Sequence, residues 1–221
     1  VSFLSRLPVR ARRDALRALR GQTLRTELYA LDGTARQSRP YTVTESLHAV
    51  SDLPGSRPAG ETLPTSPSSL DQTDWRLRVF FSFQFAQRTS QWERGEQPLV
   101  GFSRTDKYDA FGQAQEQISA AVPRSRALNH QQTVAADTSP YLALLTRTQY
   151  AYSATAYLTG RVAAVRAYEV ASSGGNSVGD FLDGAQVLSS ALDAGMSPSG
   201  LKLGYETRSY YDGAAYVGMS L

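Results

Sequence analysis

The sequence predicts a mainly β protein, built as an antiparallel sheet of long strands with two short helices. Two observations carry this prediction. Twelve tyrosines and eight phenylalanines suit half-buried pleated surfaces, whereas charged residues make up only 19% of the 221 residues. Several stretches also alternate apolar and polar residues and end in turn-forming pairs, which is the pattern of strands rather than of helices.

Residues 1–50 are expected to hold a short helix and the first strands. A helix is predicted at 11–20, with Gly21 where a left-handed cap would sit. Residues 22–34 alternate as a strand and end at Asp32 and Gly33, a strong tight-turn pair. Residues 41–50 alternate as well and predict another strand.

Residues 51–75 read as a loop or linker. Proline, serine and glycine dominate this stretch, so it has little apolar surface with which to offset the entropy of ordering. We expect an antiparallel β region at 76–221 to follow it.

That β region starts with the clearest strand in the chain, "LRVFFSFQFAQ". Its residues 77, 79, 81, 83 and 85 are all apolar and would share one face, which we expect to be core. A helix would scatter these side chains around its circumference.

Further strands and a helix complete the predicted β region. Residues 99–108 and 113–122 read as a hairpin whose reversal contains Tyr108, Asp109 and Gly112. Strands are also predicted near 143–152 and 162–170, a helix near 180–193, and a last strand from 201. That strand runs into a second Tyr-Asp turn, formed by Tyr211, Asp212 and Gly213.

Composition argues against several classes of function. The chain has no cysteine, which excludes disulfides, zinc–thiolate sites and thiol nucleophiles. Nine of its basic residues precede position 40, but residues 5–20 contain no aromatic, so a solvated helix face is favoured over a nucleic-acid site. No apolar run is long enough to predict a membrane span. The start at Val1 and the abrupt end suggest a piece of a longer polypeptide.

The titratable residues do not form a convincing reaction centre. His48 and His130 have no second ligand at metal-binding spacing. Abundant serines and the glycine-rich stretch "SSGGNSVGDF" at 172–181 match neither a hydrolase elbow nor a phosphate loop. We therefore predict no catalytic residue, no cofactor and no metal.

Two pairs of acids are explained more simply by structural roles than by catalysis. On a strand, Asp106 and Asp109 would point to opposite faces, and Asp109 suits a bend. On a helix, Asp180 and Asp183 would share a face in the first turn, where carboxylates complement the helix dipole.

An alternative function is a stand-alone β-rich module that binds glycans. Trp75 and Trp92 are the strongest stacking candidates, and they lie at the two ends of the phenylalanine-rich region.

Four stretches resemble a known family. They are "ALRGQTLRTELYALDGT" at 18–34, "PYTVTES" at 40–46, "WERGEQPLVGFSRTDKYDAFGQAQEQISAAVPR" at 92–124 and "ETRSYYDGAAYVGMSL" at 206–221. Together they resemble the middle-to-C-terminal region of the TcdB-type B component of bacterial insecticidal toxin complexes, in the SpvB/TcdB and RHS/YD-repeat class.

This resemblance implies a secreted, non-enzymatic structural segment. In the family, such a segment looks like the start of an RHS-type β shell that encapsulates a toxin and leads into the RHS repeats. The two Tyr-Asp stretches would be early turns of that wall. The implied partners are the remainder of the toxin polypeptide, the partner subunits of the complex and the enclosed toxin. No nucleic acid is implied.

Overall fold

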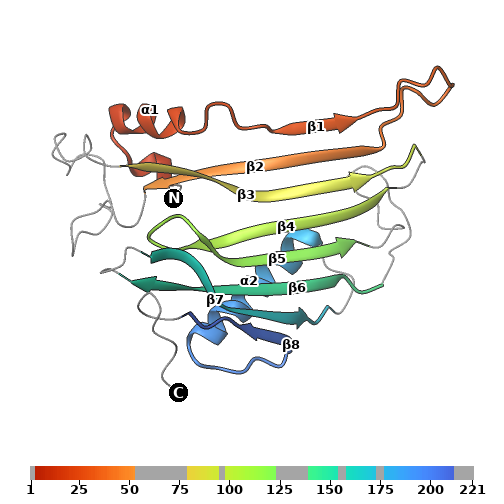
Figure 1. The fold of residues 1–221 in the computed structure, drawn as a ribbon. Helices are drawn as coiled ribbons and strands as arrows, with labels where there is room; N and C mark the ends of the chain where they lie inside the picture. The colour runs from red at the N-terminus through yellow and green to blue at the C-terminus, as the bar shows by residue number, and fades with distance from the viewer. Residues whose placement is uncertain are drawn as a thin grey trace.

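The described chain forms one antiparallel sheet in which the order of the eight strands follows their order in the sequence (Figure 1). The computed structural model describes residues 3–52, 79–94, 98–122, 139–153, 158–172 and 177–211. The strands are β1 (Arg25–Leu28), β2 (Thr42–Asp52), β3 (Phe80–Gln91), β4 (Leu99–Tyr108), β5 (Ala114–Val122), β6 (Leu142–Ser153), β7 (Leu158–Val170) and β8 (Leu201–Arg208). The prediction of a mainly β, antiparallel fold is confirmed.

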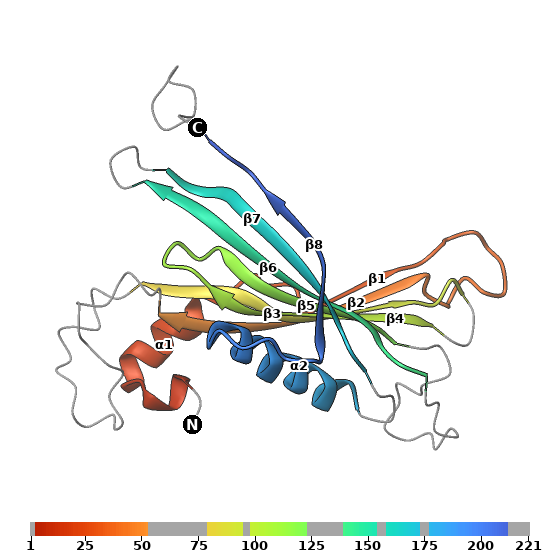
Figure 2. The same ribbon diagram turned by 90° about the horizontal axis from the view of Figure 1, so that it is seen from below.

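Among the described residues, two α-helices and one 3-10 turn, η1 (Phe3–Arg6), accompany the sheet. The first helix is α1 (Val9–Arg17), and Gly21 follows it with a φ of 79°. The second is α2 (Val178–Asp193), which is 16 residues long. Figure 2 shows both helices on the same side of the sheet, while β7 and β8 turn away from that side.

The first strand is much shorter than the alternation of residues 22–34 predicts. Only Arg25–Leu28 pairs with β2, and all four residues are exposed. Asp32 and Gly33 do not close a two-residue hairpin, because residues 29–41 form a longer connection. Gly33 has a φ of 70° inside it. The tight turn is replaced by successive bends whose side chains cap neighbouring backbone N–H groups.

The prediction that the phenylalanine face of β3 is core is wrong. Phe80 packs against the η1–α1 region, but Phe81 and Phe83 are only half-buried on the other side of the strand. Val79, predicted on the same face as these two rings, is 55% exposed. Alternation identifies a face of shared side chains, but a core also requires a second layer, and both helices lie on the opposite side.

The main core lies between α2 and strands β4–β7. There Val100, Ile118 and Leu145 of the sheet are at most 1% exposed, and they pack in one cluster with Phe181 and Ala185 of α2. A smaller cluster joins α1 to β2 and β3. Because β2 pairs with β3 along its whole length, the strands before and after the 51–75 stretch belong to one sheet.

Within the described ranges, no helix is both long and apolar enough to span a bilayer. Residues 53–78 and 123–138 lie outside the described residues, and these include the predicted 51–75 loop beyond Asp52 and His130.

Candidate functional site

Asp109 lies at the reversal between β4 and β5, where its carboxylate binds the backbone. Its Oδ1 accepts hydrogen bonds from the N–H groups of Phe111, at 2.8 Å, and Gln113, at 2.9 Å. The N–H of Asp109 donates to the carbonyl of Gln113 at 2.9 Å. The side chain therefore replaces missing backbone partners across the bend, and Oδ1 has a structural role as the acceptor of both hydrogen bonds.

Gly112 completes this reversal in a conformation that favours glycine, with a φ of 77°. A Cβ at this position would come within 2.9 Å of the ring of Phe81. Tyr108 packs on the same rings, with centroid distances of 5.3 Å to Phe81 and 4.7 Å to Phe83. Its hydroxyl donates to the carbonyl of Gln84 at 3.1 Å. The turn is thus packed against β3.

Asp32 organises the long connection between β1 and β2. Its Oδ1 accepts from the N–H of Thr34 at 3.1 Å, and its Oδ2 lies 2.7 Å from Nη1 of Arg94. The hydrogen bond from Arg94, followed by those from Thr34, lowers the pKa of Asp32 to about 2. The guanidinium carbon of Arg94 also lies 5.5 Å from the centre of the Tyr41 ring. These contacts tie the connection to the end of β3.

The second Tyr-Asp stretch is described only as far as its tyrosine. The hydroxyl of Tyr211 donates to the carbonyl of Val162 at 2.9 Å, and Arg161 lies 5.7 Å from the centre of its ring. Asp212 and Gly213 lie outside the described residues. Tyr211 therefore anchors the chain after β8 back onto β7.

The two tryptophans are not shown to share a surface. Trp92 is half-buried just after β3, and its backbone N–H donates to the carbonyl of Tyr41 at 2.7 Å. Trp75 lies outside the described residues. The shared stacking surface of Trp75 and Trp92 therefore stays a prediction.

The most elaborate polar cluster joins β4, β5 and β6 to the end of α2. At its centre is Glu116, whose side chain is 1% exposed. Its Oε2 accepts from Lys107 Nζ at 2.9 Å, from Arg147 Nε at 3.2 Å and from Ser189 Oγ at 2.5 Å. Lys107 and Arg147 also form ion pairs with Asp193. We call these five residues the Glu116 cluster.

The charges of the Glu116 cluster compensate one another. Asp193 is the last residue of α2, where the helix dipole disfavours a carboxylate. Its pKa is nevertheless lowered, chiefly by the hydrogen bond from Lys107 and also by Arg147. Burial alone would lower the pKa of Lys107, but its bonds to Asp193 and Glu116 outweigh that effect, and the pKa is raised. The cluster therefore holds the C-terminal end of α2 onto the sheet.

Arg104 holds the middle of α2 in the same way. Its guanidinium donates to Asp183 at 2.8 Å, to the carbonyl of Leu182 at 2.9 Å and to Gln186 at 3.0 Å. The arginine side chain is 7% exposed. Asp183 thus lies beyond the first turn and pairs with the sheet, so the expectation that it complements the helix dipole is wrong.

Asp180 and His48 also have structural partners. Asp180 lies in the first turn of α2, where its N–H donates to Ser177 Oγ at 3.1 Å. His48 Nε2 lies 3.1 Å from the carbonyl of Thr23. In strand β4, Asp106 falls where the pairing with β5 shifts. Across the described ranges, no three His, Asp or Glu side chains gather as metal ligands.

The Glu116 cluster is not among the sites predicted from the sequence, although the sequence carries a signal of it. Glu116 alternates with Ile118, Ala120 and Val122, so a period of two places its carboxylate on an apolar face. A charge on such a face requires a partner in the folded protein. Which residues supply that partner depends on the register of β4 and β6, which the sequence alone does not provide.

Comparison with known proteins gives a family match over much of the chain. Residues 14–160 match the family described as the insecticide toxin TcdB middle/C-terminal region. A search of curated proteins gives no significant match.

Several solved toxin structures share this fold. A TcdB2-TccC3 structure without the hypervariable C-terminal region is 24% identical, with a TM-score of 0.59 over 93% of this chain. The Photorhabdus luminescens Tc holotoxin pore is 24% identical, with a TM-score of 0.53 over 83% of this chain. A TcdB2-TccC3-Cdc42 structure is 26% identical, with a TM-score of 0.51 over 75% of this chain.

The chain spans only 8% to 9% of the length of these matched chains. The family match covers well over half of this sequence, and the eight-stranded antiparallel sheet agrees with the fold of the toxin structures. The chain therefore belongs to the TcdB toxin middle/C-terminal family.

Proposed function

We propose that this chain is a non-enzymatic wall segment of a secreted toxin complex, and that it forms part of a β shell enclosing a toxin. Its partners would be the remainder of its own toxin polypeptide, the partner subunit of the complex and the enclosed toxin. Membership in the TcdB family and the likeness to TcdB2-TccC3 structures support this proposal.

The observation that carries the proposal is the sheet itself. Its eight strands follow one another in sequential order, with β1 at one edge and β8 at the other. Such a sheet can be extended strand by strand into a curved wall without rearranging its topology. In Figure 1 the two edge strands lie at opposite sides of the molecule, as continuation in both directions requires.

The edge strand β8 is poorly protected in the described chain. Seven of its eight residues are exposed, including Leu203 at 48% and Tyr205 at 55%. An edge strand is a template for pairing with another strand, and the charged residues Lys202, Glu206 and Arg208 protect this edge only in part. A further strand of the shell lying beside β8 would bury these side chains and satisfy its outward backbone groups.

The uses of the acidic side chains support a structural role over a catalytic one. Asp109 caps a turn, while Glu116, Asp183 and Asp193 attach α2 to the sheet. By this proposal the two Tyr-Asp stretches, Tyr108–Asp109 with Gly112 and Tyr211–Gly213, are early turns of the shell wall.

Protease protection of the toxin tests encapsulation. The complete B-type chain containing this region is assembled with its toxin-bearing partner, and trypsin is added. Proline in place of Tyr205 would interrupt β8, whereas proline in place of Leu31 lies in a connection where that residue is 88% exposed. We expect the toxin to be cleaved rapidly in the Tyr205→Pro complex and to survive in the Leu31→Pro complex. Equal survival of the toxin in both assembled complexes would count against the proposal that this chain forms part of the shell wall.

A further inference from the structure

Helix α1 is fixed firmly enough to present a defined outer surface. Ala11 and Ala15 are at most 2% exposed and pack with Val50 of β2. Arg12 donates to the carbonyls of Leu4, at 3.0 Å, and Leu7, at 3.2 Å, which ties the helix to the turn before it. The outer surface of α1 therefore keeps a fixed position relative to the sheet.

The outer surface of α1 is a stripe of alternating apolar and cationic side chains. Val9, Arg13 and Leu16 are spaced by four and three residues, which places them along one side of α1 and opposite the buried alanines. Arg20 lies three residues beyond the end of the helix and lines the same surface as Arg13 and Leu16. Val9 is 73% exposed and Leu16 is 46% exposed. We call these four residues the α1 stripe.

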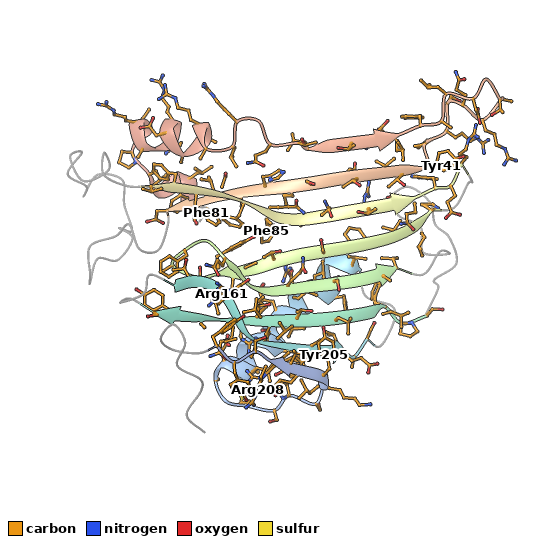
Figure 3. The ribbon with its side chains drawn as sticks, in the orientation of Figure 1. Tyr41, Phe81, Phe85, Arg161, Tyr205 and Arg208 are labelled. Atoms are coloured by element: carbon orange, nitrogen blue, oxygen red, sulfur yellow. The ribbon has the colours of Figure 1, made fainter. Side chains whose placement is uncertain are left out.

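A shallow hollow lies on the α1 stripe. It has a volume of about 210 Å³ and is lined by Leu16 and by the arginines Arg13, Arg17 and Arg20. Figure 3 shows nitrogen-tipped side chains of α1 directed away from the sheet. The hollow therefore offers an apolar floor within a cationic rim.

The charge of the α1 stripe is not compensated by the described residues. Most arginines of the described strands are paired with acids, such as Arg88 with Glu45 and Arg166 with Glu206. On α1 the described acid is Asp14, which pairs with Arg17 at 2.9 Å. No ion pair to Arg13 or Arg20 is formed by any residue in the described ranges. The stripe is thus cationic, whereas most arginines of the described strands are paired with acids.

The chemistry of the stripe favours a protein partner over a nucleic acid or a bilayer. Nucleic-acid surfaces combine basic residues with stacking aromatics, and the stripe has no aromatic residue. Interfacial helices insert a broad apolar face into lipid, whereas the main apolar face of α1 is already buried against the sheet. An apolar side chain flanked by carboxylates fits a floor of Leu16 with arginines around it.

We propose that the α1 stripe docks an acidic segment of the same toxin polypeptide, from outside residues 1–221, which inserts an apolar side chain beside Leu16. This inference rests on the proposed function, in which the region is embedded in a much longer chain. The matched toxin chains support that choice of partner, because the region makes up only 8% to 9% of their length.

Site-directed photo-crosslinking in the complete toxin chain tests this docking. A photoreactive phenylalanine analogue replaces Leu16, and crosslinked peptides are identified by mass spectrometry with and without the partner subunit. We expect one dominant crosslink, to an Asp- or Glu-containing peptide of the same polypeptide outside residues 1–221. Arg13→Glu with Arg20→Glu should lower its yield at least about fivefold, because two ion pairs become repulsive.

The matched control is Arg39→Glu, which reverses an exposed arginine in the connection between β1 and β2. It should leave the yield unchanged. A dominant crosslink to the partner subunit, no crosslink at all, or a yield insensitive to the Arg13 and Arg20 reversals would overturn the inference. Protease protection of the toxin is measured separately and does not depend on these crosslinks. Failure of the docking surface is therefore distinguishable from failure of the proposed function.

Discussion

Ser189 of α2 donates a hydrogen bond of 2.5 Å to Glu116 of β5, and both side chains are at most 1% exposed. This contact joins a helix to a strand 73 residues earlier in the chain. The carboxylate is stable there because Lys107 and Arg147 approach it from the two neighbouring strands. Helix α2 is thus attached to the sheet by charge as well as by apolar packing.

Replacing Glu116 with alanine should weaken this attachment. The change leaves the Ser189 hydroxyl buried without its acceptor and removes one partner of two cations, so we expect a loss of about 2–3 kcal/mol in the free energy of unfolding. Urea unfolding followed by fluorescence measures it. Glu169→Ala is the matched control, because that glutamate is exposed on β7 and should change stability by less than about 0.5 kcal/mol. Equal effects of the two changes would refute the role given to Glu116.

Gly112 and Gly184 should respond in opposite directions to alanine. At Gly112 the φ of 77° and the 2.9 Å approach to Phe81 both oppose a Cβ, and we expect a loss of roughly 1–3 kcal/mol. Gly184 lies inside α2 with nothing within 4 Å of an added Cβ, so alanine should stabilise by up to about 1 kcal/mol. Thermal unfolding of the two variants decides this. Stabilisation by Gly112→Ala would show that the reversal is wrongly described.

Asp109 should tolerate asparagine but not alanine. Asparagine keeps an acceptor at the position of Oδ1, whereas alanine removes both hydrogen bonds and should cost about 1–2 kcal/mol. A general acid or base would lose its function in both variants. Comparing the unfolding free energies and the toxin protection of the two variants separates a bend from a reaction centre.

The stability of the protein should fall with acid where Asp32 titrates. Its pKa is about 2 in the folded chain and 3.8 when unperturbed. Because the folded pKa is depressed, the stabilisation is complete above the unfolded value and is lost as pH falls from about 4 through about 2. Asp32→Asn should flatten the curve of stability against pH in that window. An unchanged curve would contradict a stabilising role of the Arg94–Asp32 ion pair.

Local chemistry explains which parts of the fold could be predicted from the sequence. The β4–β5 reversal depends on an aspartate three residues before a glycine, and these residues need only their immediate neighbours to form the bend. The α2 helix shows its own periodicity and begins at Val178, directly after Ser177, whose hydroxyl caps it. Such elements can be predicted because their causes lie within a few residues of each other.

Interactions between residues far apart in the sequence explain which predictions were wrong or missing. The rings of Phe81 and Phe83 look like core from their alternation, but their burial depends on which side of the sheet the helices cover. The Glu116 cluster draws residues from three strands and a helix, so it exists only in one register. Neither the register nor the covered side is recorded in the periodicity of any single strand.

Hydrogen exchange along β8 in the complete toxin chain tests the shell wall most directly. If β8 is an interior strand, the amides of residues 201–208 should all be protected about as well as those of β5, because strands pair with it on both sides. In an edge strand, alternate amides point away from β7 and exchange rapidly. Uniform slow exchange is the predicted result, and rapid exchange of alternate amides in the assembled toxin would contradict the account.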